Sequence, residues 1–146
     1  MPHLTATQIL SIAESTRETP RSTGREVDAV AAAMCVTFPP TFRRLMVQTG
    51  GGFERDETRF LSLHEIAAAT REAADVVANE SNFTLSKTDV VFRWDSIYAF
   101  SYFSATGEDN APIFEFNYNC ATGPVLTAKT VPQGLALSLK YILRID

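Results

Sequence analysis

The chain has 146 residues, of which 45% are hydrophobic and 21% charged, and its formal net charge is −4. This length is typical of one domain whose core is large enough to fold without a metal ion or a disulfide bond. The acidic balance, together with a few scattered lysines, argues against nucleic acid as a partner. These lysines are Lys87, Lys129 and Lys140.

The N-terminus lacks a basic stretch followed by an apolar run, so no signal peptide is expected. The longest apolar run, residues 29–36, is far shorter than the ~20 residues of a membrane-spanning helix. Cys35 and Cys120 are far apart and form no C-x-x-C pair, which favours free thiols in a reducing compartment. We therefore expect a cytoplasmic protein without a membrane partner.

Two short helices are predicted first. Apolar residues predict one helix over residues 5–14, within a helical N-terminal extension at 1–22, of which residues 17–22 form a connector. A capping box of Thr23 and Glu26 then predicts a second helix that runs to about residue 34. Cys35 ends the apolar stripe of this helix, so we expect it in the core.

Residues 38–52 predict a third helix, which prolines begin and glycines end. Proline suits the first turn because helix N-terminal N–H groups lack intrahelical partners, and glycine suits a left-handed residue at the end. These residues are Pro39, Pro40, Gly50, Gly51 and Gly52. The inward face is predicted to hold Phe42, Leu45, Met46 and Thr49. Because the glycines follow a helix, they predict a tight turn and not a phosphate-binding loop.

The next segment, residues 53–59, is rich in charge and predicts a loop. Residues 60–63 predict a short strand that leads directly into a second capping box, Ser62 and Glu65. A fourth helix then runs to about residue 79. Its inward side is expected to hold Ile66, Ala69, Ala73 and Val76.

The second half of the chain predicts strands at residues 90–94, 97–104, 113–118 and 125–127. Alternate aromatic residues predict that the two central strands pair antiparallel and stack their rings. A final helix, capped by Thr130, is expected to turn Leu135, Leu139, Ile142 and Leu143 inward. The fold class is therefore α+β in a single domain, 1–146, with N-terminal helices, an antiparallel β-meander packed against helices and a C-terminal helix.

Few residues carry recognisable chemistry. His3 and His64 are isolated and lack the spacing of zinc ligands. A G-x-S-x-G motif is absent, and a cysteine nucleophile would need a histidine beside it. We expect no metal, no cofactor and no catalytic residues.

The candidate partner-binding residues lie in acidic loops and at one tryptophan with its acidic neighbour. Trp and Tyr are enriched at interface hot spots, although Trp94 also suits a core position because it ends a strand-like run. The candidates are Glu54, Asp56, Glu57, Trp94, Asp95, Glu108 and Asp109.

Several segments together resemble the SMI1/KNR4 (SUKH) superfamily. The segment 38–42 (Phe-Pro-Pro-Thr-Phe) and the glycines at 50–52 match its helix pattern, although phenylalanine replaces the usual leucine and Thr-Gly the usual Asn-Gly. Residues 61–66 match its strand followed by a helix. The strand pair with its proline, 90–114, and the closing helix, 130–143, complete a likeness that covers residues 23–143.

The resemblance implies a protein-binding domain without catalysis or cofactor. Many bacterial members look like immunity proteins that bind and block a cognate toxin, and fungal members act as regulators through protein contacts. Acidic loops would suit a basic toxin. Two alternatives stay open: a regulatory scaffold, which could form a homodimer through a sheet edge, and an enzyme or small-ligand domain. The last would have a pocket lined by Trp94, Tyr98, Tyr102 and Tyr118.

Overall fold

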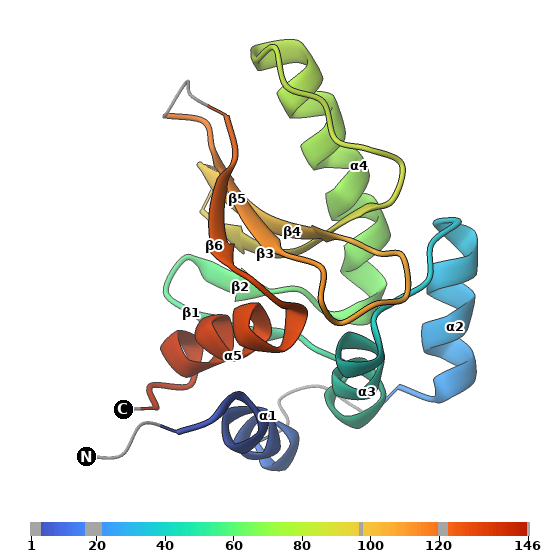
Figure 1. The fold of residues 1–146 in the computed structure, drawn as a ribbon, viewed down its shortest axis with the longest axis vertical. Coiled ribbons are helices and arrows are strands. Elements are labelled where there is room, and N and C mark those ends of the chain that lie inside the picture. Colours follow the sequence, from blue (N-terminus) through green and yellow to red (C-terminus); the bar gives the residue numbers. More distant parts are fainter. Residues whose placement is uncertain (1–3, 17–21, 97, 120–122, 146) are drawn as a thin grey trace.

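The computed structural model describes residues 4–16, 22–96, 98–119 and 123–145. Its helices are α1 (Ala6–Ser15), α2 (Gly24–Ala33), α3 (Pro40–Thr49), α4 (Leu63–Glu80) and α5 (Val131–Ile142). Its strands are β1 (Phe53–Arg55), β2 (Thr58–Phe60), β3 (Asp89–Asp95), β4 (Ala99–Ser104), β5 (Ile113–Asn117) and β6 (Val125–Ala128). The predicted α+β class is confirmed (Figure 1).

Some predicted features lie outside the described residues. These are His3, Cys120, the start of the strand at Ile97 and the connector over residues 17–21. Within the described part, no helix is both long and apolar enough to cross a membrane.

The six strands form one sheet in chain order, and each strand runs antiparallel to the next. Thr58 pairs with Asp95, Asp95 with Ala99, and Ala99 with Asn117. This register places the β1–β2, β3–β4 and β5–β6 connections at one end of the sheet, which we call the hairpin end. The β4–β5 connection lies at the opposite end.

The prediction of a loop over residues 53–59 is wrong, because this segment contains β1 and β2. Phe53, Thr58 and Phe60 are buried, whereas Glu54 and Arg59 are exposed. The rings of Phe53 and Phe60 meet edge to face, with centroids 6.3 Å apart. Alternation is the ordinary sign of a half-buried strand, but three-residue strands separated by charged residues gave too short a pattern to recognise.

The two faces of the sheet are covered by different helices (Figure 1). On one face, Arg93 bonds Ser138 of α5 and Phe103 contacts Phe42 of α3. On the other face α4 lies along β3, and its Thr70 hydroxyl accepts a hydrogen bond from the Val91 N–H. Helix α1 packs against both α5 and α3.

The predicted stacking of aromatic rings between β4 and β5 is confirmed. Phe100 stacks on Phe116 at 5.6 Å, and Tyr102 stacks on Phe114 at 5.8 Å. Phe83, which follows α4, stacks on Phe116 at 5.7 Å. These contacts tie the connection after α4 to the centre of the sheet.

The helix starts follow the predicted capping residues. The Thr23 hydroxyl accepts from the Glu26 N–H, and the Glu26 carboxylate accepts from the Thr23 N–H. Glu65 similarly accepts from the N–H and hydroxyl of Ser62. In α4, Val77 is buried where Val76 was expected. Both positions continue the stripe from Ala73, at three and four residues, and tertiary packing selects the second.

Helix α3 has the predicted bounds and inward face, and Gly50, Gly51 and Gly52 all adopt left-handed conformations with φ of 74°, 70° and 81°. Their N–H groups donate to Met46 O, Thr49 Oγ1 and Phe60 O, at 2.8, 3.0 and 3.0 Å. With all three groups bonded inside the protein, the turn has no free donors with which to hold a phosphate.

The prediction that Cys35 lies in the core is wrong, because its side chain is exposed. Cys35 adopts φ of 58°, its N–H donates to Ala32 O, and the next N–H, of Val36, donates to Ala31 O. This pair of bonds is the Schellman motif that ends helices, usually around a glycine. The left-handed turn directs the thiol away from the apolar stripe.

Candidate protein-binding surfaces

Five of the seven candidate residues lie together at the hairpin end of the sheet. Glu54 and Asp95 belong to β1 and β3, and Asp56 and Glu57 form the turn between β1 and β2. The Ser96 N–H donates to the Glu57 carbonyl oxygen at 2.8 Å and so joins the first two turns. Trp94 lies on the face of the sheet opposite to Asp95.

Three aromatic residues line the same end: Trp94, Tyr98 and Tyr118. The Tyr118 N–H donates to Tyr98 O at 2.8 Å, and the Trp94 and Tyr118 rings have centroids 6.4 Å apart. Tyr98 is 49% exposed, and the other two are half-buried. Large aromatic groups that are anchored on one side and open on the other can contact a protein at little cost in side-chain entropy.

Two carboxylates of α4 lie near Tyr118, whereas Trp94 pairs across the sheet with the exposed Arg59. Burial, and then the nearby carboxylates of Glu72 and Glu80 on α4, raise the pKa of Tyr118 to about 12. The phenol therefore stays protonated at neutral pH. Its hydroxyl oxygen is buried and has no hydrogen-bond partner among the described residues.

The acidic candidates at the hairpin end differ in their freedom to contact a partner. Glu54, Asp56 and Glu57 are exposed, and only Asp56 forms an ion pair, with Arg55 at 3.9 Å. Asp95 instead accepts hydrogen bonds from the Arg93 guanidinium at 2.9 Å and from the Thr58 hydroxyl at 2.8 Å. Asp95 is thus a structural residue that orients Arg93 toward α5.

Glu108 and Asp109 lie at the opposite end of the sheet, in the connection between β4 and β5. Glu108 is exposed. The Asp109 carboxylate accepts hydrogen bonds from the N–H and the hydroxyl of Thr41, at 3.0 and 2.6 Å. Asp109 therefore caps α3, whose own N-cap residue, Pro39, has no side chain that can do so.

Metal and nucleophile chemistry has little support among the described residues. His64 is exposed in the first turn of α4, and Cys35 is exposed in the turn after α2. In this part of the chain, no group of three or more His, Cys, Asp or Glu side chains could hold a metal ion.

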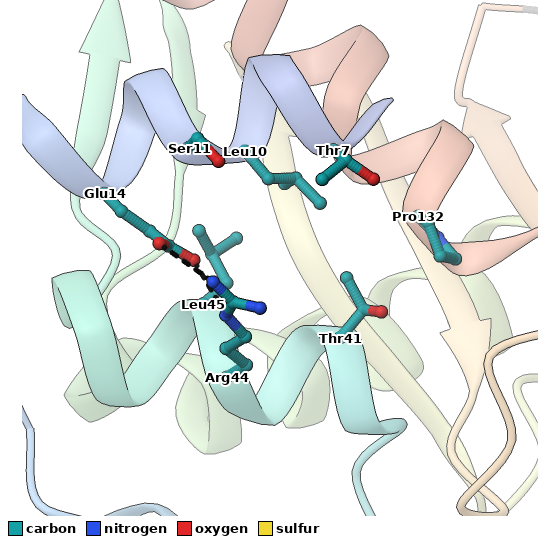
Figure 2. Close-up of a pocket in the computed structure, with 8 residues that line it drawn as sticks. All are labelled: Thr7, Leu10, Ser11, Glu14, Thr41, Arg44, Leu45 and Pro132. Carbon is teal, nitrogen blue, oxygen red and sulfur yellow. Dashed lines mark hydrogen bonds and ion pairs between the residues drawn. The ribbon is translucent and has the colours of Figure 1, made fainter. Parts of the chain in front are cut away.

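Three hollows lie among the described residues of the helical side, and none of these three is lined by the aromatic residues of the hairpin end. The first, about 170 Å³, lies between α1 and α3. Figure 2 shows that the Glu14 carboxylate on α1 reaches across it to the Arg44 guanidinium on α3, at 3.1 Å. Thr7, Ser11 and Thr41 add hydroxyl groups to its wall.

The other two hollows, about 540 and 370 Å³, lie along α5 and share Leu137 and Lys140. Exposed apolar and basic side chains surround them. We call this group the α5 surface: Arg55, Lys129, Leu137, Lys140, Tyr141 and Arg144.

Sequence reasoning missed the α5 surface because two of its cations come from other elements. Within α5 and just after it, Leu137 and Tyr141 are four residues apart, as are Lys140 and Arg144, and this spacing was the available signal. Lys129 precedes the helix, and Arg55 arrives from β1. The Arg55 guanidinium lies over the Tyr141 ring, 4.4 Å from its centroid, and donates to the Tyr141 carbonyl oxygen at 2.9 Å.

Comparison with protein-family models finds no match for this chain, and comparison with curated proteins finds none either. The likeness to the SUKH superfamily therefore remains a prediction from the sequence.

Proposed function

We propose that this chain is a non-catalytic protein-binding domain of the immunity type, which blocks a cognate protein toxin through the hairpin end of the sheet. One observation carries the proposal: Trp94, Tyr98 and Tyr118 gather at that end beside exposed carboxylates. Burial of aromatic anchors supplies most of the binding energy in protein interfaces. Surrounding charge selects the partner and speeds its approach.

The sign of the charge suggests the chemistry of the partner. Glu54, Asp56 and Glu57 are exposed on the strand and turn at this end, and Glu72 and Glu80 lie near Tyr118. A basic protein surface complements such a region, and a nuclease toxin carries basic surface for its own substrate. Occupying that surface would block the toxin without any chemistry in this chain.

Affinity capture from the organism that encodes the chain tests the proposal. The bait is the full chain in three forms: wild type, Trp94→Ala/Tyr98→Ala, and Glu108→Gln as a control at the other end of the sheet. A protein bound by the wild type and the control, but not by the double variant, is the candidate partner. That protein is then produced in a bacterial host with and without the chain.

Support for the immunity function requires that the captured protein arrests growth alone and that the wild-type chain, but not the double variant, restores growth. A captured protein without toxicity would instead favour the regulatory scaffold. Capture that is equal with all three baits would remove the hairpin end from the proposal.

A further inference from the structure

The α5 surface combines features that are rarely left exposed together. Leu137 is 55% exposed and lines both hollows, and Tyr141 is 43% exposed and lines the second. Isolated exposed apolar residues are ordinary, but a hollowed apolar surface rimmed by polar groups is typical of an interaction site. Because the hollows share Leu137 and Lys140, one continuous ligand can occupy both.

The rim of the α5 surface is positive although the chain as a whole is negative, with a net charge of −4. Lys129 and Lys140 flank the first hollow, and Arg55 and Arg144 flank the second. Among the described carboxylates, none forms an ion pair with Lys129, Lys140 or Arg144. Cations around apolar groups attract an acidic ligand, because fixed positive charge steers the ligand and is partly neutralised when the ligand binds.

We propose that the α5 surface is a docking site for an acidic protein segment that inserts a large apolar side chain between Lys129 and Lys140. Carboxylates of the segment pair with these lysines and with Arg144, and the apolar anchor covers Leu137. Leu4, Ile9 and Ala136 form the apolar wall of this hollow. The α5 surface adjoins the hairpin end at Arg55, which pairs with Asp56 at 3.9 Å, but its ligand has the opposite charge to the toxin proposed above.

Nucleic acid fits this surface less well than a protein segment. A phosphodiester backbone offers repeated negative charge but no aliphatic group to cover Leu137, and its affinity depends on many cations. The α5 surface has four, of which Arg55 already packs on Tyr141. An acidic protein segment uses both the charge and the apolar hollow.

The test uses the full-length wild-type chain to select from a random-peptide display library. We expect the enriched peptides to be acidic and to share a large aliphatic or aromatic residue. A labelled synthetic copy of the most enriched peptide then gives the Kd by fluorescence anisotropy. We expect Lys129→Glu/Lys140→Glu and, separately, Leu137→Ser to weaken binding at least about tenfold.

Two controls connect the effect to this surface. Lys87→Glu reverses an exposed lysine outside the α5 surface and should change the Kd by less than about twofold. Trp94→Ala/Tyr98→Ala should also leave the peptide Kd unchanged, so failure of the toxin proposal does not affect this result. Binding should weaken as ionic strength rises from ~0.01 M to ~0.15 M, since screening shortens the reach of the rim charges.

The proposal is overturned if selection yields no enrichment, if enriched peptides are neutral or basic, or if the charge-reversal variant binds as tightly as the wild type. A random-sequence DNA oligonucleotide that binds more tightly than the peptide, and loses binding in the charge-reversal variant, would assign the surface to nucleic acid instead.

Discussion

The Asp109 carboxylate binds both the backbone N–H and the hydroxyl of Thr41, a residue that lies 68 positions earlier in the chain. Helix α3 begins at Pro40 and has no side-chain cap of its own. The connection between β4 and β5 thus supplies a negative charge and two hydrogen bonds at a helix N-terminus, where free N–H groups and the helix dipole favour an anion.

Replacing Asp109 by alanine should therefore destabilise the fold by about 1–2 kcal/mol, the usual cost of losing a helix cap. Denaturant unfolding of the purified chain measures the change. Glu108→Ala is the matched control, because Glu108 is the exposed neighbour and should alter stability by less than ~0.5 kcal/mol. Equal effects of the two substitutions would show that Asp109 does not act as a cap.

Gly51 occupies a position that has no room for a side chain. It has φ of +70°, and a Cβ added there would lie 2.3 Å from the backbone oxygen of Leu61. Backbone cannot move away as a flexible side chain can, so Gly51→Ala should cost roughly 2–4 kcal/mol. Gly123, with φ of +89° and no atom of the described residues within 4 Å of its added Cβ, is the control. Gly123→Ala should cost only about 1 kcal/mol, for the left-handed conformation alone.

Phe42 joins α3 to the sheet. It is completely buried, and its ring meets those of Phe38 at 5.0 Å and Phe103 at 5.1 Å. Truncation removes apolar burial and leaves a cavity, so Phe42→Ala should destabilise the protein by roughly 3–5 kcal/mol in chemical denaturation. Phe42→Leu keeps most of the volume and should cost clearly less. A loss below ~1 kcal/mol for alanine would contradict the packing of α3 against this face.

Much of this fold could be predicted because its signals are local. The capping residues Thr23 and Glu26 lie three positions apart, and the proline and glycine limits of α3 are visible in one segment. The alternating aromatic residues of β4 and β5 similarly carry their own period. Each of these patterns specifies a backbone geometry without information from the rest of the chain.

The omissions involve contacts that no local pattern contains, whereas the errors at Cys35 and at β1 and β2 concern local structure. The Asp109 cap and the approach of Arg55 to Tyr141 join residues 68 and 86 positions apart. Cys35 ends a helix in a left-handed conformation that is usual for glycine. The general tendency of cysteine to be buried therefore predicted the wrong environment. For the candidate site, chain order could name exposed carboxylates but not which turns share an end of the sheet.

The left-handed conformation of Cys35 makes a stabilising substitution available. Its φ of 58° costs a side-chain-bearing residue about 1–2 kcal/mol, part of which glycine recovers. Glycine also raises the entropy of the unfolded chain, which offsets part of this gain. The net effect of Cys35→Gly should be a stabilisation of about 0.5–1 kcal/mol. Cys35→Ala keeps the Cβ and should leave stability nearly unchanged. Unfolding under reducing conditions compares the three proteins, and equal stabilities for glycine and alanine would contradict the role of φ.

Tyr118 gives a prediction with a pH dependence. Its buried hydroxyl has no partner within the described part of the chain, so Tyr118→Phe should stabilise the protein at neutral pH by about 1 kcal/mol, the desolvation cost that the hydroxyl no longer imposes. Tyr98→Phe, at a residue that is 49% exposed, is the control and should change neutral-pH stability little. No gain for Tyr118→Phe at neutral pH would mean that the hydroxyl is hydrated in solution.

The sign of the pH effect follows from the direction of the pKa shift. The unfolded chain releases the phenol proton near pH ~10, whereas the folded protein keeps the pKa of Tyr118 at about 12. Ionisation of Tyr118 therefore does not affect the stability of the wild-type chain below pH ~10. As pH rises toward ~12, the wild-type chain loses stability, because only the unfolded state ionises in this range. Phenylalanine does not titrate, so the stability advantage of Tyr118→Phe should widen across this window in parallel urea unfolding curves. An advantage that stays constant from neutral pH to pH ~12 would show that folding does not raise the pKa of this phenol.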